Sequence, residues 1–231
     1  MSKIVECINL SKYYGSFKAL DDVNLQIESG RIVGLLGPNG SGKTTLIKIL
    51  NGLLTPSSGS VLIDGEKPGE KTKSIVSYLP DTNFLNSWMT VEQIVDLFKD
   101  FYSDFDEEKA YSMLSKLRVN KDAKLKNLSK GNKEKVCLIL IMSRKAKLYI
   151  LDEPIAAVDP ATRDFILSTI LNNYHDDSTI IISTHLIHDI ESVLDDVLFL
   201  EDGRISLQRT KQEIVDRGKT VDELFREVFK W

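Results

Sequence analysis

The sequence predicts an α/β fold, in which a mostly parallel sheet is covered by helices on both faces and is joined by an antiparallel edge sheet and an inserted α-helical subdomain. Three observations support this prediction. Short apolar runs alternate with helical stretches along the chain. A glycine-rich loop connects one of these runs to a helix. A segment from about residue 83 to 142 carries helix-start signals in place of strand patterns.

Size and charge limit the classes of protein that the chain can be. Its 231 residues, 42% of them hydrophobic, suffice for one well-cored domain and are too few for two of ordinary size. The formal net charge of -4 provides no basic field for nucleic-acid phosphates, so no nucleic-acid partner is expected. Cys7 and Cys137 lack Cys-x-x-Cys spacing and are expected to be small buried hydrophobic residues.

Targeting and membrane-spanning signals are not found. The N-terminal MSKIVECINL has no apolar core followed by a small-residue cleavage site, so we expect no secretory signal. The longest apolar run, residues 136–142, is far shorter than the ~20 residues that cross a bilayer. We therefore expect a cytoplasmic protein whose association with a membrane depends on a partner.

The first part of the chain shows both kinds of strand and then a helix. Apolar and polar residues alternate over 23–27, which predicts a half-exposed strand of an edge sheet, whereas 32–36 is continuously apolar and predicts a buried central strand. A helix is expected over 43–50, ended by Asn51-Gly52, and residues 55–59 are expected to form a surface loop.

Helix-start signals characterise the middle of the chain. Thr90 and Gln93 form a capping box, and the acidic residues 106–108 place negative charge at the first turn of the next helix. The acidic cluster 104–108 is either a docking surface or a solvated helix start, and we favour the second. We expect one domain, 1–231, with a core of about 1–82 and 143–231 and a helical subdomain of about 83–142.

Two further apolar strands follow, at 148–151 and 180–182. They are separated by a helix that Asp159 can cap, with Pro160 at its first position. Residues 201–204 then predict a hairpin-like turn.

The glycine-rich loop fits the pattern G-x-x-x-x-G-K-[ST] and predicts a P-loop NTPase core. Its residues are Gly37, Pro38, Asn39, Gly40, Ser41, Gly42, Lys43 and Thr44, and Thr45 continues the nucleotide-binding segment. Glycines allow backbone N–H groups to approach phosphate oxygens at a helix N-terminus. We expect Lys43 against the β- and γ-phosphates and the Thr44 hydroxyl on Mg²⁺. A chance glycine-rich turn is disfavoured by the buried strand before the loop.

A pair of carboxylates ends the strand at 148–151. Asp152 and Glu153 lie at the carboxyl end of that strand, where ligands bind in open α/β sheets. Adjacent acids on a surface are usually only solvated, but their place after a buried strand in a P-loop chain indicates a function. We expect Asp152 on the Mg²⁺ side and Glu153 as the general base for water.

Further segments stand in a fixed order along the chain. They are Leu128-Ser129-Lys130-Gly131-Asn132, Leu151-Asp152-Glu153-Pro154, Val158-Asp159-Pro160 and Ser183-Thr184-His185. A P-loop by itself leaves kinases, GTPases and helicases open. The ordered set strongly resembles an ABC ATPase over nearly the whole chain.

This resemblance implies a second ABC cassette as partner, in a dimer of two such subunits. Ser129 and Gly131 would belong to a signature loop that reaches the γ-phosphate in the partner, although Ser129 alone reads as an ordinary helix cap. His185 would contact the γ-phosphate and help hold the attacking water, although a lone histidine is more often structural. Tyr14 would stack on adenine; its neighbour Tyr13, or a core role for Tyr14, are the alternatives.

Departures from the family pattern occur at four positions. Asp81 stands where the family usually has a Gln that touches Mg²⁺, and Lys130 and Asn132 replace the usual Gly and Gln of the signature. Lys135 stands where Arg is frequent. Because the other motif residues match, we interpret these departures as tuning rather than loss of activity.

The resemblance implies an ATP-binding and ATP-hydrolysing subunit with ATP and Mg²⁺ as cofactors. We expect it to power an ABC transporter from the cytoplasmic face of the cell membrane, docked on a separate multi-span membrane subunit; similarity to bacterial ABC-2-type exporters is weak. A soluble ABC ATPase acting on ribosomes or nucleic acid is the alternative. The docking site is expected at about 82–89, through Phe84, Leu85, Trp88 and Met89, unless these residues pack the subdomain onto the core.

Overall fold

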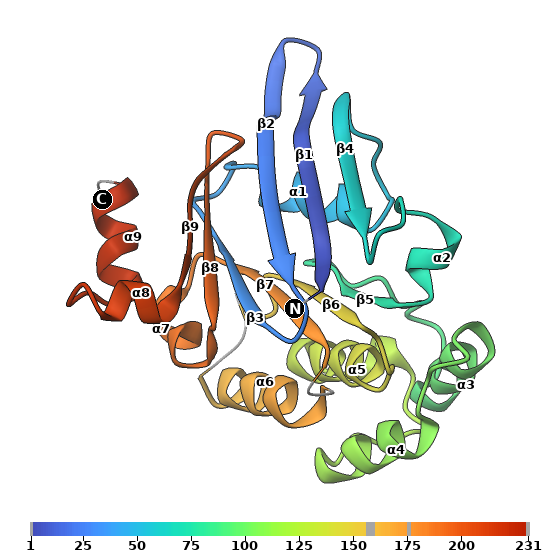
Figure 1. Cartoon of the computed structure of the whole chain (residues 1–231). Helices are drawn as coiled ribbons and strands as arrows, with labels where there is room; N and C mark the ends of the chain where they lie inside the picture. Colours follow the sequence, from blue (N-terminus) through green and yellow to red (C-terminus); the bar gives the residue numbers. More distant parts are fainter. Residues whose placement is uncertain (1, 156–159, 175–176, 230–231) are drawn as a thin grey trace.

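The computed structural model describes residues 2–155, 160–174 and 177–229 (Figure 1). The predicted cap Asp159 and the motif residue Val158 lie outside this part of the chain. The strands are β1 (Lys3–Tyr14), β2 (Phe17–Glu28), β3 (Ile32–Leu36), β4 (Ser58–Ile63), β5 (Val76–Leu79), β6 (Leu148–Asp152), β7 (Thr179–Thr184), β8 (Asp196–Glu201) and β9 (Arg204–Thr210). The helices are α1 (Lys43–Leu50), α2 (Glu70–Lys73), α3 (Val91–Phe101), α4 (Glu107–Lys116), η1 (Leu125–Asn127), α5 (Lys130–Met142), α6 (Pro160–Asn173), α7 (Ile187–Ile190), η2 (Glu191–Val193), α8 (Lys211–Val215) and α9 (Val221–Phe229).

A six-stranded sheet in the order β5-β6-β7-β3-β8-β9 forms the centre of the fold. Its strands pair in parallel except for β9, which forms an antiparallel hairpin with β8 across the predicted turn at 201–204. Every residue of β3, β6 and β7 is buried. The predicted α/β class and the central position of the strand at 32–36 are confirmed. Parallel pairing brings the carboxyl ends of these strands to one edge, where the P-loop also begins.

The antiparallel edge sheet has the order β2-β1-β4. Residues 23–27 of β2 alternate between buried and exposed, as predicted. The predicted loop at 55–59 is wrong at its end, because β4 begins at Ser58. Ser58 pairs with Ser11 of β1, and a Cβ atom on Gly59 would lie 2.2 Å from the carbonyl oxygen of Asn9. Gly59 therefore permits β4 to lie close to β1. The turn-like composition of residues 55–59 does not reveal this contact.

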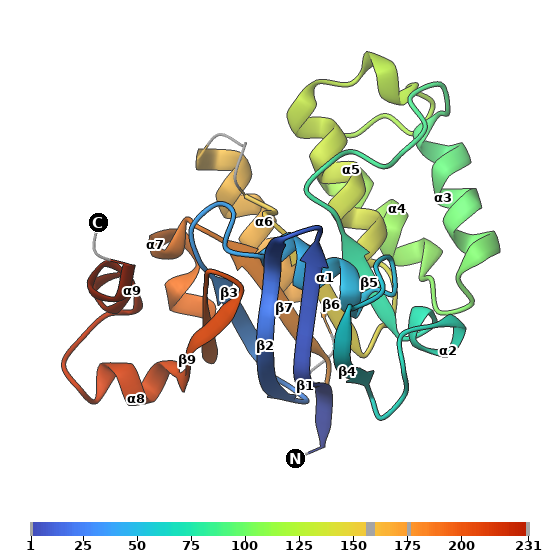
Figure 2. The ribbon, with the colours of Figure 1, turned by 90° about the horizontal axis from the view of Figure 1, so that it is seen from above.

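Two hydrophobic clusters cover the faces of the six-stranded sheet. Alternate residues of β3 divide between them: Val33 and Leu35 face the cluster with α1 and the edge sheet, whereas Ile32 and Leu36 face the cluster that includes α3 to α6. Figure 2 shows α3 to α5 at one end of the molecule and α8 and α9 at the other. The boundary between core and helical subdomain stays a prediction, since α5 packs against both β5 and α6.

The helix starts predicted at Thr90 and at residues 106–108 are confirmed. Thr90 caps α3 in a capping box with Gln93, and Asp106 caps α4 by accepting a hydrogen bond from the Lys109 N–H. The uncharged thiols of Cys7 and Cys137 are both buried, and burial raises the pKa of each to about 12. Among the described helices, none has the length and apolar character to span a bilayer.

Arg144 ties the helical segment to the sheet. Its side chain is 2% exposed and forms two hydrogen bonds with the Asp104 carboxylate, at 3.0 and 3.1 Å. The same guanidinium donates to the backbone carbonyls of Val76 and Ser74 and lies 3.9 Å from the ring centre of Tyr102. Asp104 of the acidic cluster 104–108 is thus engaged in a structural contact, and the cap that Asp106 forms on α4 agrees with the helix-start interpretation.

Candidate functional site

The P-loop connects the buried end of β3 to α1, and its glycines allow close packing. A Cβ atom on Gly37 would lie 2.3 Å from the Leu200 carbonyl oxygen. Gly42 has φ +110, and a Cβ atom on it would lie 2.5 Å from the Ala19 carbonyl oxygen. No side chain caps α1. The N–H groups of its first turn, at Lys43, Thr44 and Thr45, can therefore bind a phosphate anion.

Lys43 lies across the mouth of this loop. Its ammonium donates to the carbonyl oxygens of Gly37 (2.8 Å) and Pro38 (3.1 Å) and lies 3.9 Å from a carboxylate oxygen of Glu153. Burial lowers the pKa of Lys43, while the charges of Glu153 and Asp152 oppose that shift. A buried ammonium held by neutral carbonyls is ready to exchange them for phosphate oxygens.

Asp152 ends β6 and is 1% exposed. Its Oδ1 accepts a hydrogen bond from the Ser183 hydroxyl at 2.5 Å, whereas its Oδ2 is buried with no hydrogen-bond partner in the described part of the chain. Burial raises the pKa of Asp152, the charge of Asp81 adds to the rise, and the hydroxyls of Ser183 and Thr44 oppose it. This environment disfavours a bare carboxylate and favours one that is neutralised by a cation.

These groups fit a Mg²⁺ ion that is shared with nucleotide phosphates. The free Asp152 Oδ2 and the Thr44 hydroxyl are oxygen ligands of the type that Mg²⁺ prefers. Within residues 2–155, 160–174 and 177–229 no group of three or more His, Cys, Asp or Glu side chains is arranged to hold a metal. The ion would thus depend on phosphate oxygens for part of its coordination.

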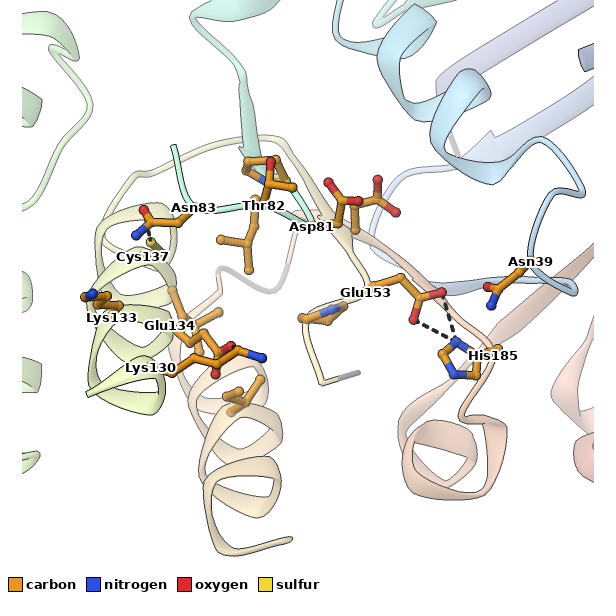
Figure 3. Close-up of a pocket in the computed structure, with 16 residues that line it drawn as sticks. Asn39, Asp81, Thr82, Asn83, Lys130, Lys133, Glu134, Cys137, Glu153 and His185 are labelled. Atoms are coloured by element: carbon orange, nitrogen blue, oxygen red, sulfur yellow. Dashed lines mark hydrogen bonds and ion pairs between the residues drawn. The ribbon is translucent and has the colours of Figure 1, made fainter. Parts of the chain in front are cut away.

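Glu153 and His185 face each other at the ends of β6 and β7. The Nδ1 atom of His185 lies 3.2 and 3.1 Å from the two carboxylate oxygens of Glu153 (Figure 3). The Glu153 N–H donates to the carbonyl oxygen (3.1 Å) and the hydroxyl (3.0 Å) of Ser183. Glu153 adopts φ +50, a left-handed conformation that is rare for a residue with a side chain.

Ser183 is a site residue that the sequence did not single out by itself. It is the register partner of Asp152 in the parallel β6–β7 pair. Its hydroxyl holds the Asp152 side chain and the Glu153 backbone together. A serine at the end of a predicted strand is a weak signal, because the register of a parallel pair cannot be read from the sequence.

The aromatic residues expected at the adenine lie at the tip of the β1–β2 hairpin. Tyr14 is 50% and Tyr13 38% exposed, so a core role for either is wrong. The Lys12 ammonium lies 5.4 Å from the ring centre of Tyr14, and that of Lys18 lies 5.8 Å from that of Tyr13. Both rings stay available for stacking, and the choice between them stays open.

The signature segment lies apart from the P-loop. Ser129 caps α5 by accepting a hydrogen bond from the Asn132 N–H at 3.3 Å, and Gly131 lies within the first turn. Figure 3 shows Lys130, at the start of α5, and Asn39, of the P-loop, on opposite sides of a cavity with Glu153 between them. Lys135 points toward α6, with its ammonium 5.6 Å from the ring centre of Phe165.

A cavity of about 410 Å³ lies between the P-loop, the ends of β6 and β7, and the start of α5. Its polar lining includes Asp81, Asn39, Lys130, Asp152, Glu153 and His185. Asp81 follows β5 and is exposed, but its charge acts on Asp152. Two of the predicted catalytic residues, Glu153 and His185, therefore open onto one space with Asp152 and with Lys130 of the signature helix, whereas the third, Lys43, is not part of the lining. Tyr14 and Ser129 are not part of its lining.

A phosphate-binding loop, a strand-end Asp-Glu pair and a facing histidine define a P-loop nucleotide-binding protein of the α/β class. The chain belongs to the ABC transporter family, whose sequence model matches residues 20–156.

Relatives of known name agree with this membership. The ABC transporter ATP-binding protein YtrB of Bacillus subtilis is 33% identical over 219 residues, covering 92% of this chain and 75% of that protein. A probable sulfate/thiosulfate import ATP-binding protein, CysA of Chlorella vulgaris, is 33% identical over 230 residues, which cover 94% of each chain. A solved ATP-binding subunit of an ABC transporter superposes with a TM-score of 0.88 at 28% identity, covering 98% of this chain and 99% of the other.

Proposed function

We propose that the chain binds and hydrolyses ATP as one half of a nucleotide-sandwich dimer that powers an ABC transporter. It would act at the cytoplasmic face of the membrane, docked on separate membrane-spanning subunits. The observation that carries the catalytic part is the contact between Glu153 and His185, beside the P-loop Lys43 and the free Asp152 oxygen.

Hydrolysis requires a base, a phosphate cradle and charge neutralisation around the γ-phosphate. Glu153 is positioned to accept a proton from the attacking water, because its carboxylate faces the cavity and its backbone is fixed by Ser183. His185 orients that carboxylate. Lys43 and the N–H groups of α1 hold the phosphates. Mg²⁺ would neutralise charge on the phosphate oxygens from the Asp152 side.

The dimer completes a site that one chain leaves open. Lys130, at the start of α5, and Asn39, of the P-loop, lie on opposite sides of the cavity (Figure 3), and Ser129 is not part of the lining of that cavity. Ser129 and Gly131 would instead meet the γ-phosphate in a second copy, where the α5 N-terminus favours an anion. Closure of the pair would thus complete the active site.

A second groove, of about 750 Å³, supports docking on another protein; it shares Pro80, Asp81 and Thr82 with the cavity at Glu153. It lies between α1 and α3 and is lined by several exposed apolar side chains: Leu53 (58% exposed), Phe84 (43%) and Phe101 (75%). The four apolar residues of the predicted docking stretch at 82–89 have different surroundings. Phe84 lines the groove, whereas Leu85 and Met89 pack against the core cluster and Trp88, though 64% exposed, lies outside the groove lining. An apolar helix or loop of a membrane subunit would fit this surface.

The transport part is tested by extraction of the native protein in mild detergent. We expect the chain to be recovered with a multi-span membrane protein, and we expect Phe84→Glu or Phe101→Glu to abolish this association while basal ATPase persists. Trp88→Glu is the matched control, because it adds the same charge at an exposed aromatic residue outside the groove. Recovery with ribosomes or nucleic acid, and with no membrane protein, would favour the soluble alternative.

The sequence relatives favour transport over that alternative, since YtrB and CysA carry transporter names. They do not indicate a substrate for this chain. An import protein is as similar to it as YtrB is, so the weak resemblance to ABC-2-type exporters stays a prediction.

A further inference from the structure

Lys130 lies between the two residues that we expect to face the γ-phosphate in the partner. It is the first residue of α5, directly after the cap Ser129 and before Gly131. Its side chain is 71% exposed. Lys130 also lines the cavity that contains Glu153 and His185, so its ammonium belongs to the face on which ATP is handled (Figure 3).

The helix itself does not favour a cation at this position. The positive end of the helix dipole lies at the N-terminus, where acidic residues are stabilising and a lysine is not. The helices α3, α4, α8 and α9 follow this rule, with Glu or Asp in the first turn. The first turn of α5 has no acidic residue and begins with Lys130.

The contact of Lys130 with Glu134 is weak. The ammonium lies 3.9 Å from the Glu134 carboxylate, four residues along the helix. A pair with lysine on the N-terminal side is the less favourable orientation, and exposed pairs of this kind contribute little. The Lys130 ammonium can therefore leave Glu134 for a more highly charged anion at little cost.

We propose that Lys130 binds the γ-phosphate of the ATP held by the partner subunit, as a cation that supplements the Ser129 hydroxyl and the N–H groups of α5. This inference rests on the proposed nucleotide-sandwich dimer. A lysine adds a charge-assisted hydrogen bond that a glycine at this position cannot make. Because ADP lacks the γ-phosphate, the contact makes closure of the dimer selective for ATP.

The test uses the full chain with Glu153→Gln, in which ATP is retained. Light scattering after gel filtration gives the Mg-ATP concentration needed for half-maximal dimer. Lys130→Ala should raise that concentration by about tenfold or more, and the difference should shrink at high ionic strength. Lys126→Ala is the control, because Lys126 is also exposed, on η1, but does not line the cavity. The affinity of the monomer for ADP should be the same in all three proteins.

Each outcome decides between the proposals. Equal ATP requirements for the Lys130→Ala and Lys126→Ala proteins would overturn the role of Lys130 and leave the sandwich dimer intact. A weakened affinity for ADP in the Lys130→Ala monomer would also overturn it, because the lysine would then act on the phosphate site of its own chain. If the Glu153→Gln parent does not dimerise with Mg-ATP, the proposed dimer fails, and the role of Lys130 fails with it.

Discussion

The imidazole of His185 contacts both carboxylate oxygens of Glu153, at 3.2 and 3.1 Å, from the end of the neighbouring strand. This contact depends on two features of the backbone. The parallel pairing of β6 with β7 brings the two strand ends together, and the left-handed conformation of Glu153 turns its chain away from the strand path. Ser183 fixes that turn by accepting the Glu153 N–H.

Replacement of the proposed base is expected to separate binding from hydrolysis. Glu153→Gln removes the proton acceptor but leaves the P-loop unchanged, so ATP hydrolysis should fall by about 10²-fold or more while ATP affinity is retained. Gel filtration with Mg-ATP should then show a dimer that is stable to dilution. Unchanged turnover, with monomer only, would contradict both the base assignment and the sandwich.

The left-handed backbone at Glu153 predicts a trade between stability and activity. A residue with a Cβ atom is strained at φ +50, by roughly 1–2 kcal/mol, whereas glycine is not. Glu153→Gly should therefore unfold at a higher temperature than Glu153→Ala, by a few degrees for a chain of this size. Both variants should be inactive, so the pair isolates the backbone effect. A melting temperature of Glu153→Gly at or below that of Glu153→Ala would mean that the strain is absent.

Local patterns were sufficient for much of the fold. The helix 43–50, the central strand 32–36 and the helix caps at Thr90 and Asp106 have the predicted positions. Each of these depends on periodicity or on a cap within a few residues. The P-loop could be recognised for the same reason, because all its chemistry lies within one short segment.

Features that depend on long-range pairing could not be predicted in this way. The start of β4 at Ser58 depends on Ser11, and the place of Ser183 at the site depends on its register with Asp152. Phe84 and Trp88 are both aromatic residues of the same connecting segment, yet only Phe84 lines the groove. The path of the backbone determines which of the two side chains reaches it. Such positions carry no local signal.

Arg144 is another such residue, and its buried contacts predict a large effect on stability. Arg144→Met keeps the approximate volume but leaves the Asp104 carboxylate unpaired and the Val76 and Ser74 carbonyls without their donor. Loss of one partner of a buried ion pair costs about 3–5 kcal/mol, which for this chain lowers the melting temperature by roughly 10 °C.

The control for Arg144 is a salt bridge at the surface. Arg204 pairs with Asp21, and its side chain is 66% exposed, so Arg204→Met should cost less than about 1 kcal/mol. Differential scanning calorimetry compares the two variants. Equal melting temperatures would show that Arg144 does not hold the helical segment to the sheet.

Asp81, at the place where the family usually has Gln, predicts two effects of opposite direction. Its carboxylate adds negative charge near the Mg²⁺-side acid, so Asp81→Gln should increase the Mg²⁺ concentration needed for half-maximal ATPase at neutral pH, on the order of tenfold, with little change in ATP affinity. The Asp81 charge also raises the pKa of Asp152, in addition to the larger effect of burial. In Asp81→Gln the pKa of Asp152 should therefore fall, so that Asp152 stays ionised to lower pH. The acid limb of the Mg²⁺-dependent activity should then move to lower pH. Asp122→Asn, at an exposed acid on the helical segment, is the control and should change neither quantity. If the Mg²⁺ titration and the pH profile of Asp81→Gln coincide with those of the unchanged protein, Asp81 does not act on the metal site. If the Mg²⁺ titration shifts and the pH profile does not, Asp81 acts on the ion without affecting Asp152.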